Sequence, residues 1–285
     1  MNKEKTTISG NLLEFESYPE SKARDFSYRG RKENESSEEQ KAHNKQLSRK
    51  KVVRLVNANF EKDDYFVTLT FDAENAPEDY AAAHRLVDNC LRRIKRRAEK
   101  AVNDAKSKMV LLKQELEIDP SNVGLTAALE ELQKIDRPLK YLYVISDGVY
   151  ASGKLVQKDS YHVHMFITAV LARSVMEELW KYGTITRFAR FDPERYGPEG
   201  AALYVADNKL EKRRVSHSKN FNVPIEEKGE RRVSVFEVAD MCEKRVDDKT
   251  YWENRFPGYG FVRTVSRFNS RYATWHLRVV LYKYE

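Results

Sequence analysis

The chain has 285 residues, which is enough for one large domain or two small ones. Lys and Arg number 51 against 44 Asp and Glu, and the resulting net charge of +7 is compatible with a phosphate-bearing partner without requiring one. No stretch approaches the roughly 18 consecutive apolar residues of a membrane-spanning helix, which argues against an integral membrane protein.

The expected location is a reducing, cytoplasmic compartment. No apolar run follows the polar start at Met1–Lys5, so we predict no secretory signal peptide. The two cysteines, Cys90 and Cys242, lie far apart and match no metal-binding or redox spacing, so we expect both to be reduced packing residues.

The N-terminal part of the chain is predicted to be flexible until a basic helix begins. Residues 1–45 are polar and charge-mixed, which is typical of segments that cannot bury a core. Arg49–Val56 then has the pattern of a basic helix. Tyr65–Phe71 alternates as a strand does and places Thr68 and Thr70 on the same face.

A long helical hairpin is predicted after this strand. Pro77–Asp79 opens a helix whose apolar residues recur at spacings of three and four as far as Leu116. Asp119–Ser121 ends it, and a second helix follows until Arg137. The pair is longer than a strand-to-strand crossover needs, so we interpret about residues 98–137 as an inserted helical hairpin.

The next segments complete an α+β pattern. Strands are predicted at Tyr141–Ile145, Tyr161–Ile167 and Thr184–Phe191, with helices at Ser174–Tyr182 and at about residues 199–213. We therefore expect a central antiparallel sheet with helices packed on it.

Residues 226–285 form a β-rich extension in this interpretation. Val233–Val238 is predicted as a strand, and Phe261–Phe268 with Thr274–Tyr284 as a hairpin. The extension could either enlarge the main sheet or form a small accessory lobe.

Two histidines flank one apolar residue in the strand Tyr161–Ile167. Side chains on a strand alternate between its faces, so His162 and His164 point the same way while Val163 points the other way. Two neutral imidazoles in this arrangement can hold one divalent ion. The alternative is a half-buried strand whose polar face happens to carry histidines.

An ordered set of three segments resembles a known family. A Thr-rich strand at Phe66–Phe71 is followed by the His162-Val163-His164 strand and by a helix with Tyr204-Val205-Ala206-Asp207-Asn208-Lys209. This set resembles the HUH endonucleases, specifically the rolling-circle replication initiators of phages and plasmids. The resemblance covers about residues 46–225 and implies the HUH, ferredoxin-like nuclease fold.

The resemblance implies a chemistry for these residues. A Mg²⁺ or Mn²⁺ ion held by His162 and His164 would polarise the scissile phosphate. Tyr204 would attack phosphorus and remain on the 5′ end, leaving a 3′-OH that primes rolling-circle replication. Without the histidine strand, Tyr204 would be interpreted as a packed aromatic residue.

Two expected parts of the site depart from the usual family pattern. The third metal ligand is predicted to be Asp147, with Glu177, Glu178 or a water as alternatives. Relatives often place a lysine four residues after the tyrosine, but here that position is Asn208, and Lys209 follows it. Either Lys209 or Asn208 would orient the phosphate.

The expected partner is single-stranded DNA at a replication origin, in the cytoplasm of a bacterial host. DNA contacts are assigned to Thr68, Thr70, Arg213, Arg214 and Lys219. Host replication proteins such as a helicase are further expected partners. Two alternatives stay open: a related transposase or relaxase with the same chemistry, and a catalytically inactive nucleic-acid-binding protein with the same fold.

Overall fold

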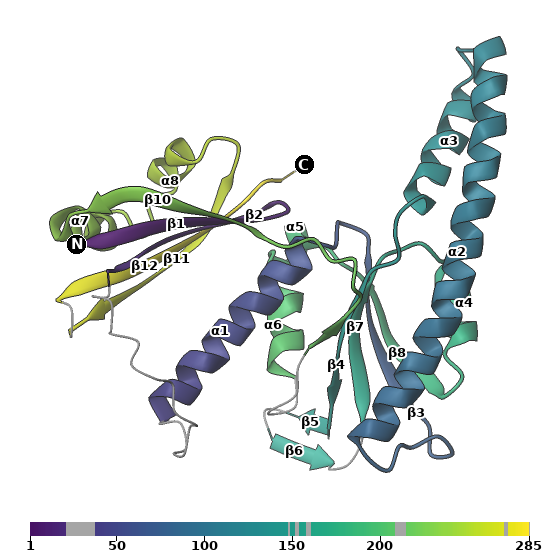
Figure 1. The fold of residues 1–285 in the computed structure, drawn as a ribbon, viewed down its shortest axis with the longest axis horizontal. Coiled ribbons are helices and arrows are strands. Elements are labelled where there is room, and N and C mark those ends of the chain that lie inside the picture. The colour runs from purple at the N-terminus through teal and green to yellow at the C-terminus, as the bar shows by residue number, and fades with distance from the viewer. Residues whose placement is uncertain are drawn as a thin grey trace, which may run out of the picture. The chain divides into compact units, whose positions relative to one another are not determined.

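The computed structural model of the chain describes residues 1–20, 38–147, 149–151, 154–157, 161–208, 215–270 and 273–284. It is an α+β protein whose described strand pairs are antiparallel, as predicted (Figure 1). The chain forms two units. The histidine unit comprises residues 60–192 and 204–220, and the terminal unit comprises residues 1–59, 193–203 and 221–285. No helix among the described residues is both long enough and apolar enough to cross a membrane.

The histidine unit is built on a five-stranded sheet with the order β8-β3-β7-β4-β9. Its strands are β3 (Tyr65–Phe71), β4 (Tyr141–Ser146), β7 (His162–Ile167), β8 (Gly183–Arg190) and β9 (Ser216–His217). A separate two-stranded ribbon joins β5 (Val149–Ala151) to β6 (Lys154–Gln157).

One face of this sheet packs into the hydrophobic core of the histidine unit. Val67, Leu69, Val163 and Met165 point to it and are buried with residues of α2 (Tyr80–Ile118) and α4 (Arg173–Leu179). The alternation predicted for β3 and β7 is therefore confirmed. Figure 1 shows α2 and α4 on the same side of the sheet.

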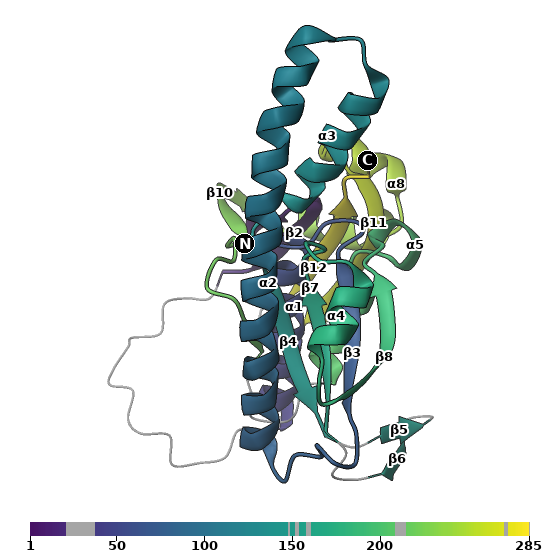
Figure 2. The ribbon, with the colours of Figure 1, turned by 90° about the vertical axis from the view of Figure 1, so that its right-hand side faces the viewer.

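The predicted helical hairpin is present. Helix α2 begins at the side-chain cap of Asp79, whose carboxylate accepts a hydrogen bond from the Ala82 amide at 2.6 Å. Helix α3 (Val123–Ile135) turns back along α2, and the pair extends beyond the sheet (Figures 1 and 2). All of α3 is described, and none of its side chains is buried.

A buried carboxylate joins three segments of the histidine unit. Asp64 is fully buried and accepts two hydrogen bonds from Arg137, at 3.1 and 2.9 Å. It also accepts from the backbone amides of Glu61 and Ala169, both at 2.9 Å. The start of β3, the end of the hairpin and the segment after β7 are thus fixed by one side chain.

We expect Asp64→Asn to lower the free energy of unfolding by about 3 kcal/mol, because it breaks a buried ion pair on one side only. Urea denaturation followed by circular dichroism measures the change. Asp63→Asn is the matched control, since Asp63 is exposed and has a positive φ of 74°, which asparagine tolerates well. Equal stabilities of the two variants would contradict the role given to Asp64.

The terminal unit holds a second five-stranded sheet, with the order β10-β1-β2-β12-β11. The strands are β1 (Asn2–Ser9), β2 (Leu12–Pro19), β10 (Ile225–Val233), β11 (Gly260–Asn269) and β12 (Thr274–Tyr282). The helices that begin in this unit are α1 (Glu38–Asn57), α5 (Pro193–Tyr196), α6 (Gly200–Asp207), α7 (Val235–Lys244) and α8 (Lys249–Arg255). From Tyr204 onward, α6 belongs to the histidine unit.

The predicted flexibility of residues 1–45 is wrong for Asn2–Pro19, which forms β1 and β2. Leu13 and Phe15 lie in the core of the terminal unit. Glu14 and Glu16, on the other face of β2, are also buried, and Arg54 of α1 pairs with both. The polar composition of this segment therefore reflects a buried ionic network. Residues 21–37 lie outside the described part of the chain.

Two further predictions for the terminal unit can be compared with its structure. The predicted hairpin is confirmed as β11 and β12, but Val233–Val238 is not one strand. Ser234 caps α7 by accepting a hydrogen bond from the Glu237 amide at 3.1 Å, so β10 ends at Val233 and a helix begins. The predicted boundaries at residues 45 and 225 do not coincide with the division into units, because α1 packs with the terminal strands.

The stability of the terminal unit is expected to depend on acid pH through Glu16. Burial acts to raise the pKa of Glu16, but the charge and hydrogen bond of Lys50 and the charges of Arg54 and Lys5 more than offset it, and the pKa falls from 4.5 to about 2. A lowered carboxylate pKa stabilises the folded state fully above the unfolded pKa, and this contribution is lost as pH falls through the folded pKa. We expect wild type to lose about 3 kcal/mol more than Glu16→Gln between pH 5 and pH 2 in urea titrations. Parallel pH profiles for the two proteins would contradict this assignment.

Candidate active site

The two histidines lie on the face of the sheet opposite the hydrophobic core. In the strand register His164 is paired with Thr68 of β3, and His162 with Thr70. On the other side, β4 pairs Ser146 with His162. The side chains of these positions share one face because paired residues in antiparallel strands point the same way.

His164 is held in one orientation and has one unsatisfied nitrogen. Its side chain is only 2% exposed, and the Thr68 hydroxyl lies 3.1 Å from its Nδ1 atom. Its Nε2 atom is buried and has no hydrogen-bond partner. Burial, with the electrostatic influence of His162 and of the Arg187 guanidinium, lowers the pKa of His164 to about 3. The imidazole is therefore neutral at pH 7, and with Nδ1–H donating to Thr68 the lone pair is on Nε2.

His162 completes a pair with His164. The two ring centroids are 4.7 Å apart and the rings are nearly perpendicular. His162 is half-buried at the end of β7. The prediction that both histidines project from the same face of one strand is confirmed by this contact.

Tyr204 lies against the same histidine. Its ring centroid is 4.9 Å from that of His164 and 6.1 Å from that of Phe66, in both cases edge to face. The side chain is 43% exposed. Tyr204 is therefore not a packed core residue, and its hydroxyl-bearing ring adjoins the histidine pair.

The structure gives Asn208 a local role. Its side-chain nitrogen donates to the Tyr204 carbonyl at 2.8 Å, and its own carbonyl accepts a hydrogen bond from the Ser146 hydroxyl. These bonds fix the end of α6 to the end of β4. The predicted residues Lys209, Arg213 and Arg214 lie outside the described residues.

The predicted third ligand, Asp147, follows the last residue of β4. Among the described residues, no three His, Cys, Asp or Glu side chains are grouped as a metal site requires. Ser146 occupies the strand position beside His162, and Asp147 comes one residue later, after β4 has ended. Ser146, and not Asp147, is therefore the β4 residue whose strand position shares a face with His162.

The residues assigned to DNA contact have different surroundings. Thr68 is 9% exposed and bonds His164, so its hydroxyl orients that ring. Thr70 is half-buried and its hydroxyl lies 3.0 Å from that of Thr186. Lys219 is exposed on the segment after β9. Of these three residues, Thr70 and Lys219 have solvent-accessible surface that a ligand could contact.

Comparison of the chain with protein-family models, curated proteins and solved structures finds no match.

A residue that the sequence argument missed lies beside this site. Arg187 is exposed on β8, pairs in register with Thr68, and places its guanidinium 5.1 Å from the centre of the Phe66 ring. The only available sequence signal was its position in the predicted strand Thr184–Phe191. That signal could not tell which face Arg187 occupies, because the register of β8 shifts between Thr68 and Leu69.

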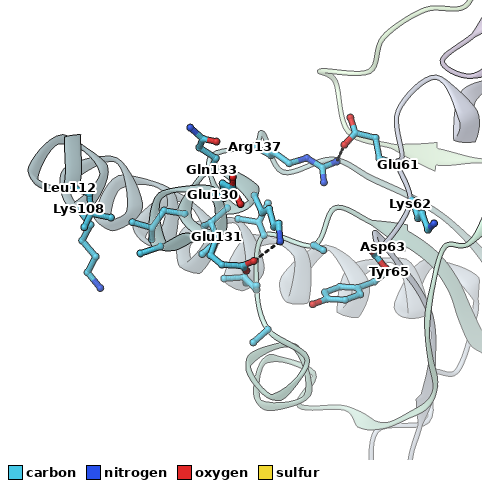
Figure 3. A pocket seen from close by; sticks show the side chains of 18 of the residues that line it. Glu61, Lys62, Asp63, Tyr65, Lys108, Leu112, Glu130, Glu131, Gln133 and Arg137 are labelled. Carbon is cyan, nitrogen blue, oxygen red and sulfur yellow. Dashed lines mark hydrogen bonds and ion pairs between the residues drawn. The ribbon is translucent and has the colours of Figure 1, made fainter. Parts of the chain in front are cut away.

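A separate pocket lies at the base of the helical hairpin (Figure 3). Its rim carries charges of both signs that pair with one another, including Glu131 with Lys134 and Arg137 with Glu61. None of the predicted site residues that the structure describes lines it. This pocket is therefore not part of the candidate site.

Proposed function

We propose that the protein nicks and joins single-stranded DNA through a covalent bond to Tyr204, and that it thereby initiates rolling-circle replication. The observation that carries the proposal is the buried, unpartnered Nε2 atom of His164 beside the half-exposed ring of Tyr204. The antiparallel sheet with the histidine pair on its central strand is compatible with the HUH nuclease fold.

The histidine pair fits a divalent metal ion. A buried imidazole nitrogen without a partner is costly unless a ligand satisfies it, and Thr68 supports His164 in the way that second-sphere groups support metal-bound histidines. His162 and His164 would hold the ion, and nitrogen ligands favour Mn²⁺ over Mg²⁺. When bound, the ion supplies Lewis-acid polarisation of a phosphate oxygen.

Tyr204 would act as the nucleophile. Its phenolic oxygen forms a bond to phosphorus while the bond from phosphorus to the 3′ oxygen breaks. The phenolic proton passes to solvent and the departing 3′ oxygen takes up a proton, so the step is balanced without another reactant. The 5′ phosphate stays esterified to Tyr204, and the free 3′-OH can be extended by a polymerase. Attack by another 3′-OH reverses the step, rejoins DNA and releases Tyr204.

The alternatives differ in how they use the same site. A transposase or relaxase would perform identical chemistry on a different DNA. An inactive DNA-binding protein is favoured by one observation, the lack of a third His, Cys, Asp or Glu grouped with the two histidines among the described residues. A water or a phosphate oxygen could fill the positions that two histidines leave open, so this observation does not exclude catalysis.

The decisive experiment is detection of the covalent adduct. The protein is incubated with a random-sequence pool of 3′-labelled single-stranded DNA and Mn²⁺ or Mg²⁺, and then analysed on a denaturing gel. The label must be at the 3′ end because the fragment with the 5′ phosphate stays on the protein. We expect a metal-dependent labelled protein band whose DNA, once sequenced, defines the cleavage site. No band with either metal would refute the proposed function.

A further inference from the structure

Strand β8 carries an irregularity that re-aims two consecutive side chains. Its register with β3 shifts by one residue, so that Arg187 pairs with Thr68 and Ile185 with Leu69, leaving Thr186 extra. In a regular strand, consecutive side chains point to opposite faces. Bulges of this kind often occur beside active sites, where they redirect a side chain.

Both side chains at the bulge reach the face that carries the histidines. The Thr186 hydroxyl lies 3.0 Å from that of Thr70, the register partner of His162. The Arg187 guanidinium lies over the ring of Phe66, which in turn contacts Tyr204. The bulge therefore adds a cation and a hydroxyl to the edge of the Tyr204 site.

The charge of Arg187 is not neutralised by the described part of the protein. No described carboxylate forms an ion pair with it, and its guanidinium lies over the uncharged ring of Phe66. The guanidinium is exposed and therefore accessible to a ligand. Guanidinium groups bind phosphate oxygens through paired hydrogen bonds, which makes an anionic DNA backbone the chemical match.

We propose that Arg187 is a catalytic residue that contacts the phosphate attacked by Tyr204 and neutralises the negative charge developing on it. This inference rests on the proposed function. Thr70 and Thr186 are positioning residues beside Arg187 on the sheet face that carries the histidines. Their hydroxyls can donate hydrogen bonds to DNA phosphates next to the attacked one. Arg187 supplies a positive charge from β8 in addition to the phosphate-orienting role that the sequence assigns to Lys209 or Asn208.

The chain offers a matched control for Arg187. Arg190 is also exposed on β8 and places its guanidinium 5.0 Å from the centre of an aromatic ring on β3, that of Tyr65. Tyr65, however, belongs to the opposite face of the sheet. The two arginines therefore lie on the same strand, are both exposed and both contact an aromatic ring, but the rings that they contact lie on opposite faces of the sheet.

The first measurement is the rate of adduct formation at saturating DNA. We expect Arg187→Gln to slow it by about 100- to 1000-fold, as the loss of one group that stabilises transition-state charge does. Arg187→Lys should recover part of the rate, and Arg190→Gln should remain near wild type. Thermal unfolding checks that all three variants are folded. Equal rates for Arg187→Gln and Arg190→Gln would overturn the inference.

The second measurement locates the contact on the DNA. Oligonucleotides with one uncharged methylphosphonate linkage are bound to Tyr204→Phe protein, with and without Arg187→Gln. We expect Arg187→Gln to weaken binding of the all-phosphate DNA about tenfold, but not of DNA that is neutral at the attacked linkage. The inference would be overturned if the effect of Arg187→Gln disappeared only when a different linkage is made neutral, or if it were the same with every linkage. A wild-type protein that forms no adduct would instead refute the proposed function, so the two failures are distinguishable.

Discussion

Replacing Tyr204 by Phe should abolish the covalent protein–DNA adduct while leaving DNA affinity within about twofold, because only the nucleophilic oxygen is removed. The Phe ring retains the edge contacts with His164 and Phe66, which involve the ring and not the hydroxyl. Loss of the nucleophile in covalent catalysis typically removes many orders of magnitude in rate, and we expect no adduct above background on a denaturing gel.

Tyr196→Phe provides the control for this experiment. Tyr196 is an exposed tyrosine of α5 in the terminal unit, at 62% against 43% for Tyr204, and its ring lies 5.2 Å from the Arg195 guanidinium. The control should form the adduct at the wild-type rate. If Tyr204→Phe still formed the adduct, or if Tyr196→Phe lost it, Tyr204 would not be the nucleophile.

The second large effect is expected on metal binding. His164→Asn should weaken Mn²⁺ binding by at least about 100-fold, because it removes a direct ligand, whereas even second-sphere changes cost about 10- to 100-fold. Isothermal titration calorimetry without DNA measures this affinity directly. The readout does not depend on cleavage, so it tests the metal site even if the correct DNA is not at hand.

Two further variants guard against a folding artefact. His162→Asn changes the half-buried member of the pair, where substitution disturbs packing less, and should weaken Mn²⁺ binding in the same direction. His84→Asn is the control, because His84 lies on α2 and bonds Tyr143 on the opposite face at 3.1 Å. Unchanged Mn²⁺ affinity in both variants of the pair would refute the metal site and favour an inactive DNA-binding protein.

Local patterns predicted the histidine unit well. The period-two alternation of β3 and β7 placed the core residues on one face and the histidines on the other, and the three-and-four spacing of α2 gave the helical hairpin. These patterns are reliable because one face of each element is apolar and buried. Tyr204 was assigned to the site from the resemblance of the ordered motifs, and its ring lies against that of His164.

Features that depend on distant pairing could not be predicted in the same way. Glu14 and Glu16 looked solvated because the partners that satisfy them, Arg54 and Arg278, are far away in the sequence. The bulge that re-aims Arg187 exists only in the register between β3 and β8. Asp147 was chosen as the neighbour of Ser146, the position that matches the family's third ligand, whereas only the register of β4 shows that Ser146 is the residue paired with His162.

The helical hairpin has a consequence for how this protein can vary. Helix α3 buries none of its side chains, and the ion pair between Lys106 and Asp136, at 3.3 Å, brings the two arms together near its base. Whole turns could therefore be removed from or added to both arms without moving a residue of β3 or β7. The outer hairpin is a module whose length can evolve, or be engineered to carry a fluorophore or an extra domain, at little cost to the sheet face that carries the histidines.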